Sequence, residues 1–291
     1  AFGAAMFAKD KFLNKKAKSL LENNTLDRIS ITDDFTTKNI HCKGCVNHCV
    51  VTKFVFKNGN TFFSGNKCEK IFSNKGEKHE TGFNFFEYKN SIIFNRQSAR
   101  SKLKIGIPRV LNMYENYPFW HSLFTHCGIE TVLSDESSLP LYKKGLGTVM
   151  SDSICFPAKL VNGHIFQLAE KKINRIFYPI VIYEAKEYAM AQNTFNCPIV
   201  SSYPDVIRSA VNPEKRFGIP FDSPTINFTD IQLLKKACFK YLKQFGVTKK
   251  VFQKAFKNAI RQQNTVKKQL LNKGSEIIER AKQDNRFVVV L

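Results

Sequence analysis

Four of the eight cysteines lie within the 27 residues from Cys42 to Cys68, and this clustering constrains the fold more than any other feature. Cys42, Cys45 and Cys49 follow the spacing C-x2-C-x3-C, and eighteen residues separate them from Cys68. Thiolates this close together either bind a metal or pair as disulfides. Gly44 is expected to let the backbone turn between the first two cysteines, because glycine tolerates positive φ. The segment predicts a tight cysteine-rich knuckle.

The chain between the third and fourth cysteines is expected to form a β-hairpin. Residues 50–57 are an apolar run rich in β-forming side chains, and residues 61–63 are its return. Asn58-Gly59 between them is a strong two-residue turn signal. Such a hairpin would carry Cys68 back beside Cys49 and complete a four-sulfur site.

Two metal centres suit four thiolates. Zinc takes four cysteines as a structural ion, and a [4Fe-4S] cluster also takes four, so the spacing does not decide between them. Two disulfides or four buried free thiols are the readings without a metal. No secretory signal is recognised, which disfavours disulfides and indicates a reducing, cytoplasmic location. His41 and His48 are stand-in ligands, but the all-cysteine set is preferred because four cysteines are present.

The net charge of +21 permits several anionic partners. Nucleic acid, an anionic membrane surface, an acidic protein and a polyphosphate cofactor all fit, and the charge alone does not choose among them. Residues 235–286 hold fifteen Lys or Arg against three acids. They form either a solvated helix face or a dock for an acidic neighbour or a phosphate-bearing ligand. No uninterrupted apolar run of about 18 residues occurs, so no transmembrane helix is expected.

From residue 101 onward the pattern is typical of an α/β domain. Residues 104–108 predict a buried strand, 117–127 a helix closed by Gly128, and 131–133 the next strand. Further strands are expected at 147–150, 175–182, 198–200 and 225–228, and helices at 157–172, 204–210, 230–245 and 248–272, with a restart at Gly274-Ser275. The predicted fold class is α/β: a Rossmann-like parallel sheet flanked by helices, preceded by a small cysteine-rich β-hairpin knuckle.

Three parts are predicted along the chain. Residues 1–28 are the tail helix of a preceding module and a linker, 29–100 are the knuckle, hairpin and connector, and 101–291 are the Rossmann-like domain. A short strand is expected at 29–32. The chain opens on small and apolar residues and closes on an apolar strand at 287–291. Both ends are therefore expected to be cut from a larger polypeptide, with the last domain truncated.

Cys155 and Cys197 lie at junctions between predicted elements, and ligands of open α/β sheets bind at strand-to-helix junctions. A thiolate at a helix N-terminus is electrostatically favoured, so each residue is either a cluster ligand or a plain buried cysteine. Cys127 and Cys238 lie on apolar helix faces and are expected in the core, and His164 is interpreted as structural. No Walker A, G-x-G-x-x-G, G-x-S-x-G or H-E-x-x-H motif occurs.

Three segments, 105–120, 151–165 and Asn196-Cys197-Pro198, resemble the central, uncharacterised region of the large CoA-substrate-specific enzyme activases. These are relatives of the activators of 2-hydroxyacyl-CoA dehydratase and benzoyl-CoA reductase. The pattern from Cys42 to Cys68 resembles the stretch just upstream in that family. The first five residues resemble the final helix of its ATPase module, and the closing residues resemble a strand that continues into the next segment.

The resemblance implies a role in electron transfer. Activases of this kind hydrolyse ATP and drive a low-potential electron from a [4Fe-4S] cluster to a dehydratase or reductase. Dehydratase-type subunits hold their own cluster through three cysteines on Rossmann-like domains. Carried over to this sequence, Cys155 and Cys197 become ligands of such a cluster. The third ligand would then lie beyond Leu291, or water or substrate would take its place.

The partners that the resemblance implies are the ATPase module of the same polypeptide, a dehydratase or reductase, and acyl-CoA. The ATPase motifs are absent from this segment, so ATP hydrolysis would belong to the parent protein. Two other classes of function stay open. One is a structural domain with a zinc knuckle and no redox role. The other is a nucleic-acid binder, which the lack of a reader motif disfavours.

Overall fold

The computed structural model describes residues 35–57, 59–68, 70–74, 83–286 and 288. The chain divides into two compact units, residues 1–80 and 81–291, and each is described by itself. The predicted tail helix and linker in 1–28, the strand at 29–32 and the closing strand lie outside the described residues, apart from Val288.

The first unit contains a three-stranded antiparallel sheet. Its strands are β1 (Phe35–His41), β2 (Val50–Phe56) and β3 (Thr61–Ser64), in the order β1-β2-β3. The predicted hairpin is confirmed, since β2 pairs with β3 and Gly59 turns the chain with φ of +84°. Strand β1 was not predicted, and it pairs with β2 from Phe35 opposite Phe56 to His41 opposite Val50.

The second unit is an α/β domain. Its strands are β4 (Lys104–Ile107), β5 (Glu130–Leu133), β6 (Arg175–Phe177), β7 (Ile180–Tyr183), β8 (Phe221–Asp222) and β9 (Thr225–Asn227). Its helices are α2 (Phe85–Phe94), α3 (Met113–His126), α4 (Leu139–Gly145), α5 (Phe156–Glu170), α6 (Pro198–Ala210), α7 (Pro213–Phe217), α8 (Ile231–Lys243) and α9 (Lys249–Gln283), with a short 3-10 helix η4 (Leu146–Thr148).

Four parallel strands form the central sheet in the order β5-β4-β6-β8. The chain begins in the middle with β4, adds β5 on one side and then crosses to β6 on the other side. This reversal is the signature of a doubly wound α/β fold, and it creates a crevice at the carboxyl ends of the strands. The predicted Rossmann-like class, with an antiparallel hairpin region before it, is confirmed.

Two prolines interrupt the strands on one side of the sheet. Pro179 separates β6 from β7 and Pro224 separates β8 from β9, as expected for a residue that cannot donate to a ladder. The breaks lie opposite each other, because the Ile180 amide donates to the Pro224 carbonyl at 3.1 Å. Beyond them β7 and β9 pair in parallel as a separate two-stranded sheet.

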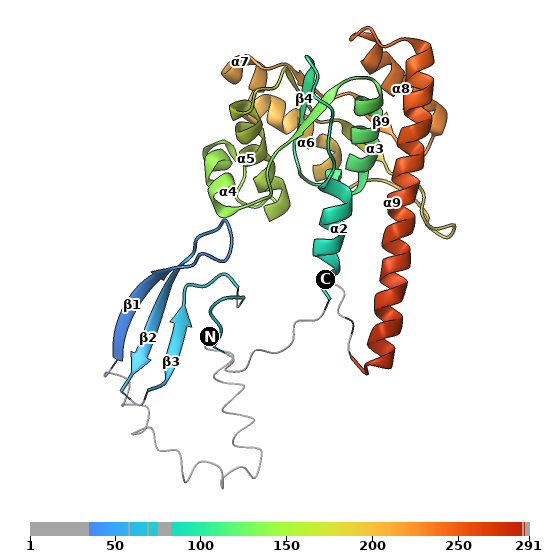
Figure 1. The fold of residues 1–291 in the computed structure, drawn as a ribbon. Helices are drawn as coiled ribbons and strands as arrows, with labels where there is room; N and C mark the ends of the chain where they lie inside the picture. Colours follow the sequence, from blue (N-terminus) through green and yellow to red (C-terminus); the bar gives the residue numbers. More distant parts are fainter. Residues whose placement is uncertain (1–34, 58, 69, 75–82, 287, 289–291) are drawn as a thin grey trace. The chain divides into compact units, whose positions relative to one another are not determined.

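Helices cover both faces of the sheet, as Figure 1 shows. Helices α3, α8 and α9 pack on one face, α2 packs against α3 and α9, and α4 to α7 pack on the other face. The core between α3 and the sheet is aromatic: the Trp120 ring lies 4.8 Å from that of Phe177, and Phe124 meets Phe177 at 5.0 Å. All three are fully or almost fully buried, so α3 is fixed firmly against the strands.

The structure corrects three of the predicted elements. Residues 147–150 contain the end of η4 instead of a strand. Residues 198–200 form the first turn of α6, since a proline at the first position suits a helix start. Helix α9 is 35 residues long and passes through Gly274 without the predicted interruption. At 1.5 Å per residue its length is roughly 52 Å. A single glycine costs only about 1 kcal/mol in a helix, too little to break one whose first half is packed in the core.

Candidate functional site

The loop between β1 and β2 folds the first three cysteines into a knuckle. The Cys42 amide donates to the Cys49 carbonyl at 2.8 Å and closes the base of the loop. The Gly44 amide lies 3.5 Å from the Cys42 sulfur and donates to it. His48, with φ of +43°, provides the left-handed turn, so the expected positive φ at Gly44 was wrong. A Cβ at position 44 would overlap Cγ1 of Ile71, so a residue larger than glycine would have to displace that exposed side chain.

The fourth cysteine follows β3 and returns toward the knuckle. Gly65, with φ of +83°, lies so close to the start of β2 that a Cβ would sit 2.7 Å from the Val50 carbonyl oxygen. The Asn66 side chain then donates to the carbonyls of Cys68 and Phe72, each at 3.0 Å. The hairpin therefore leads the segment that carries Cys68 back past the residue that follows Cys49.

The four cysteines of this unit are free thiols. Cys45 and Cys68 are exposed, and Cys42 and Cys49 are half-buried, so the readings as two disulfides or as four buried thiols do not describe them. Four thiolates are the donor set that zinc and iron–sulfur clusters prefer, and the Gly44 contact supplies a donor to one sulfur. Across the described residues, however, no three His, Cys, Asp or Glu side chains are already gathered as a metal-binding group.

Cys155 and Cys197 occupy equivalent positions in the second unit. Each is exposed and forms the N-cap of a helix, Cys155 of α5 and Cys197 of α6. The two helices pack together, and the Tyr203 hydroxyl of α6 donates to Asn162 of α5 at 3.3 Å. The pKa of Tyr203 is raised, chiefly by burial and further by Cys155. Both thiols therefore lie at helix starts on one layer of the domain.

The two remaining cysteines of the second unit belong to the core. Cys238 is buried in α8, and burial raises the pKa of its thiol strongly. Cys127 ends α3 and packs against the core, and burial raises the pKa of its thiol to about 11. Both thiols are therefore protonated at neutral pH, and their place in or against the core is the one predicted.

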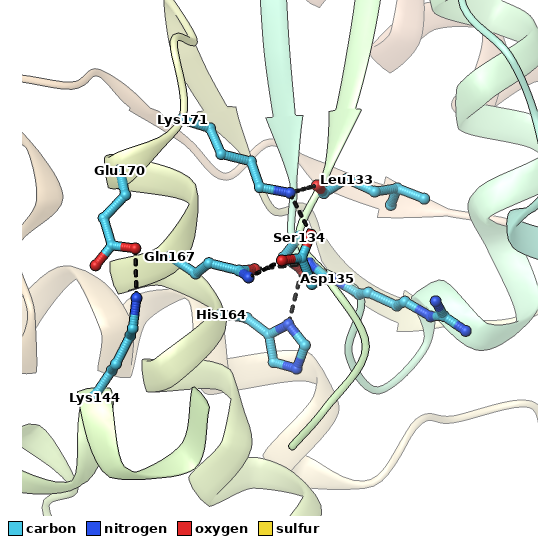
Figure 2. Close-up of polar contacts among 9 residues, drawn as sticks. Leu133, Ser134, Asp135, Lys144, His164, Gln167, Glu170 and Lys171 are labelled. Carbon is cyan, nitrogen blue, oxygen red and sulfur yellow. Dashed lines mark hydrogen bonds and ion pairs between the residues drawn. The ribbon is translucent and has the colours of Figure 1, made fainter. Parts of the chain in front are cut away.

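A polar network that the sequence analysis missed joins the end of β5 to α5 (Figure 2). The Ser134 side chain lies 2.7 Å from Nδ1 of His164, and Ser137 lies 2.9 Å from Nε2. Asp135 accepts from Lys171 at 2.7 Å and from Gln167 at 2.5 Å. The Lys171 hydrogen bond is the largest of the causes that lower the pKa of Asp135.

His164 is the centre of this network and has no exposed surface. Burial, aided by the charges of Arg109 and Lys171, lowers its pKa to about 4, although Asp135 acts in the opposite direction. The imidazole is therefore neutral at pH 7, and each of its ring nitrogens is hydrogen-bonded to a serine hydroxyl group. It holds the segment after β5 on α5, which is the structural role predicted for it.

A cavity of about 790 Å³ lies beside this network, at the carboxyl ends of β4 and β5 and against α2. Arg109 comes two residues after β4 and Glu136 three residues after β5, and both line it. Their signal was present in the sequence: polar residues that come shortly after two buried strands are expected to meet at one edge of a parallel sheet. Side chains from α2 complete the wall, and nothing in the local sequence of α2 indicates this.

A second cavity, of about 330 Å³, lies at the end of β7. Glu184 lines it and accepts hydrogen bonds from the amide groups of Asn116 and Asn196, all at 3.0 Å. Burial raises the pKa of Glu184 more than these hydrogen bonds lower it. Asn196 immediately precedes Cys197, so this network also anchors the start of α6.

The fold and these sites together define a doubly wound α/β domain with ligand-sized cavities at its carboxyl edge. Residues 104–291, from β4 onward, match the family described as CoA enzyme activase uncharacterised domain (DUF2229). The chain therefore belongs to this family. No curated protein matches the chain, and no solved structure matches it. No helix among the described residues is long and apolar enough to cross a membrane.

Proposed function

We propose that this chain is an iron–sulfur electron-transfer module of a CoA enzyme activase. Cys42, Cys45, Cys49 and Cys68 would hold a [4Fe-4S] cluster, which supplies low-potential one-electron transfer when it is bound. Membership in the CoA enzyme activase family supports a role of the chain within an activase. The observation that supports the proposal most directly is the knuckle itself. One backbone hydrogen bond joins Cys42 to Cys49, and the Gly44 amide donates to the Cys42 sulfur.

The second unit would present two further ligands and a partner surface. Cys155 and Cys197 are exposed at helix starts, where thiolates are favoured, and we assign them to a second cluster. Lys250, Lys254 and Lys257 are exposed on the first half of α9 and would meet an acidic partner or the phosphates of acyl-CoA. The partner would be a dehydratase or reductase in the cytoplasm, and ATP hydrolysis would occur on a separate module of the parent polypeptide.

The decisive experiment measures metal content and the visible spectrum of protein purified without oxygen. We expect brown protein with iron and sulfide at about four each per chain for the knuckle cluster. Cys45→Ser should remove this absorbance and leave the protein folded, because Cys45 is exposed. Cys127→Ser is the matched control and should keep the colour, since that thiol is packed against the core.

A different result would favour the other reading of the knuckle. One zinc per chain with no visible band would make the four cysteines a structural clip and remove the redox role. Protein that stays colourless and binds no metal after anaerobic reconstitution would contradict both readings of the site.

The second cluster is tested separately. We expect iron in excess of the knuckle's share, and Cys155→Ser and Cys197→Ser should each remove that excess and leave the rest. If both variants keep the full iron content of the wild-type protein, these cysteines are not ligands. The knuckle assignment would then stand alone.

A further inference from the structure

The cavity at the carboxyl ends of β4 and β5 contains a buried arginine whose hydrogen bonds are incomplete. Arg109 is only 8% exposed, and its guanidinium lies 4.1 Å from the Phe94 ring. Its backbone amide donates to Ser134 at 2.7 Å. Its Nη2 contacts Glu136 at 3.0 Å, but Nε is buried without a partner in the described chain. Buried donors are nearly always paired, so an acceptor is missing here.

Among the described residues, Glu136 is the ion-pair partner of Arg109, and it is weakly held. The Glu136 side chain is 71% exposed on the segment after β5, and a pair with so exposed a partner contributes about 0–1 kcal/mol. The neighbouring Asp135 is different, because Lys171 and Gln167 already bind its oxygens. An incoming anion could therefore displace Glu136 from Arg109. It could not bind Lys171 in the same way, because Lys171 is already paired with Asp135.

A second unpaired group lines the same cavity and needs the opposite chemistry. Asn90 of α2 lines the wall, and its side-chain oxygen is buried without a partner among the described residues. An amide oxygen accepts only, so the group that completes it must carry an O–H or N–H. A ligand that offers both an acceptor and a donor would pair the two atoms.

We propose that this cavity binds a small oxyanion that carries a hydroxyl group. Its charged oxygens would bind the edge of Arg109 formed by Nε and Nη2, in the planar geometry that guanidinium favours. Its hydroxyl would donate to Asn90. The cavity is larger than a simple inorganic oxyanion, and the Phe86 ring on its wall is 58% exposed. If the oxyanion is part of an organic ligand, the apolar part of that ligand would cover this ring.

This proposal is independent of the cysteines, since none of them lines the cavity. Its test is a calorimetric titration of the whole chain with inorganic phosphate and with sulfate at constant ionic strength. Phosphate carries hydroxyl groups at neutral pH and sulfate does not, although the two are alike in shape. We expect phosphate to bind about tenfold more tightly than sulfate, because one additional hydrogen bond to a charged ligand changes the affinity by about that factor.

Variants separate the two contacts. Glu136→Gln removes the internal competitor, so we expect it to tighten binding of both anions about fivefold. Asn90→Ala should abolish the preference for phosphate and keep sulfate binding. Glu170→Gln is the matched control, because Glu170 pairs with Lys144 at the surface and does not line the cavity. It should change neither affinity.

Three results would overturn the proposal. They are equal binding of phosphate and sulfate, an unchanged affinity in Glu136→Gln, and no binding of either anion. Arg109→Lys should weaken the binding of both anions. Because Arg109 is packed on Phe94, this change also affects packing and is the less specific test. Glu136→Gln avoids this problem because the side chain is exposed. Cysteine variants should leave all these affinities as they are.

Discussion

Replacing Gly163 with alanine is expected to destabilise the second unit by about 3 kcal/mol or more. Helices α4 and α5 cross with almost no side chain between them. A Cβ at Gly163 would overlap the carbonyl oxygen of Leu141, and a Cβ at Gly145 would overlap the Gly163 amide. Overpacking costs about 1–3 kcal/mol when side chains can adjust, but here the obstacle is backbone and the helices must separate.

Urea unfolding of Gly163→Ala measures this effect, and the same substitution elsewhere gives the control. Gly274 lies in α9 with no atom within 4 Å of a Cβ at that position. Gly274→Ala should therefore stabilise the protein by about 0.5–1 kcal/mol, the usual gain from removing a glycine from a helix. A small or stabilising effect of Gly163→Ala would show that the two helices do not cross this closely.

Acid is expected to destabilise the second unit by about 3 kcal/mol through each of two buried histidines. Burial is the main cause that lowers the pKa of His164 and of His121 from 6.5 to about 4. The unfolded chain takes up these protons near pH 6.5, whereas the native state takes them up only near pH 4. The unfolded state therefore binds more protons between these values, and stability falls as the pH falls through that window. Each pKa unit corresponds to about 1.4 kcal/mol.

Urea unfolding at several pH values between 7 and 5 tests this, because carboxyl groups contribute mostly below that range. His164→Gln should flatten the dependence of stability on pH, whatever it costs at pH 7. Glu184 acts with the opposite sign, since its raised pKa makes the native state bind the proton first. A His164→Gln variant with the full pH dependence of the wild type would refute the assignment.

Hydrophobic pattern was sufficient for the parts of the fold that are buried on all sides. Strands β4 and β5 and the helix between them were predicted because Ile105, Ile107 and the apolar face of α3 are continuous in the sequence. Strand β1 escaped prediction because its side chains are almost all exposed, so its pairing with β2 left no apolar alternation to detect. The first turn of α6 was misassigned because Ile199 and Val200 favour strands locally, while the packing of Tyr203 and Ile207 favours a helix.

The candidate sites divide in the same way. The cysteine positions could be named because spacing along the chain carries the signal. The cavity around Arg109 could be anticipated only in part, because Arg109 and Glu136 follow buried strands of one sheet, whereas nothing in the sequence indicates that Asn90 of α2 joins them. Only their three-dimensional arrangement shows that Nε of Arg109 and the Asn90 oxygen have no partner within the described chain.

The paired proline breaks give the second unit a seam. Pro179 and Pro224 mark the boundary between the β7–β9 ribbon and the four-stranded sheet, and the amides of Tyr178 and Ile180 donate to Asp222 and Pro224 across it. Protection of backbone amides against deuterium is set by the smallest cooperative opening that exposes them, so Val181 and Ile226 should exchange sooner than Ile105 and Ile176. Glu184 follows β7 directly. A ligand could thus enter the smaller cavity through opening of this ribbon alone, with the rest of the sheet intact.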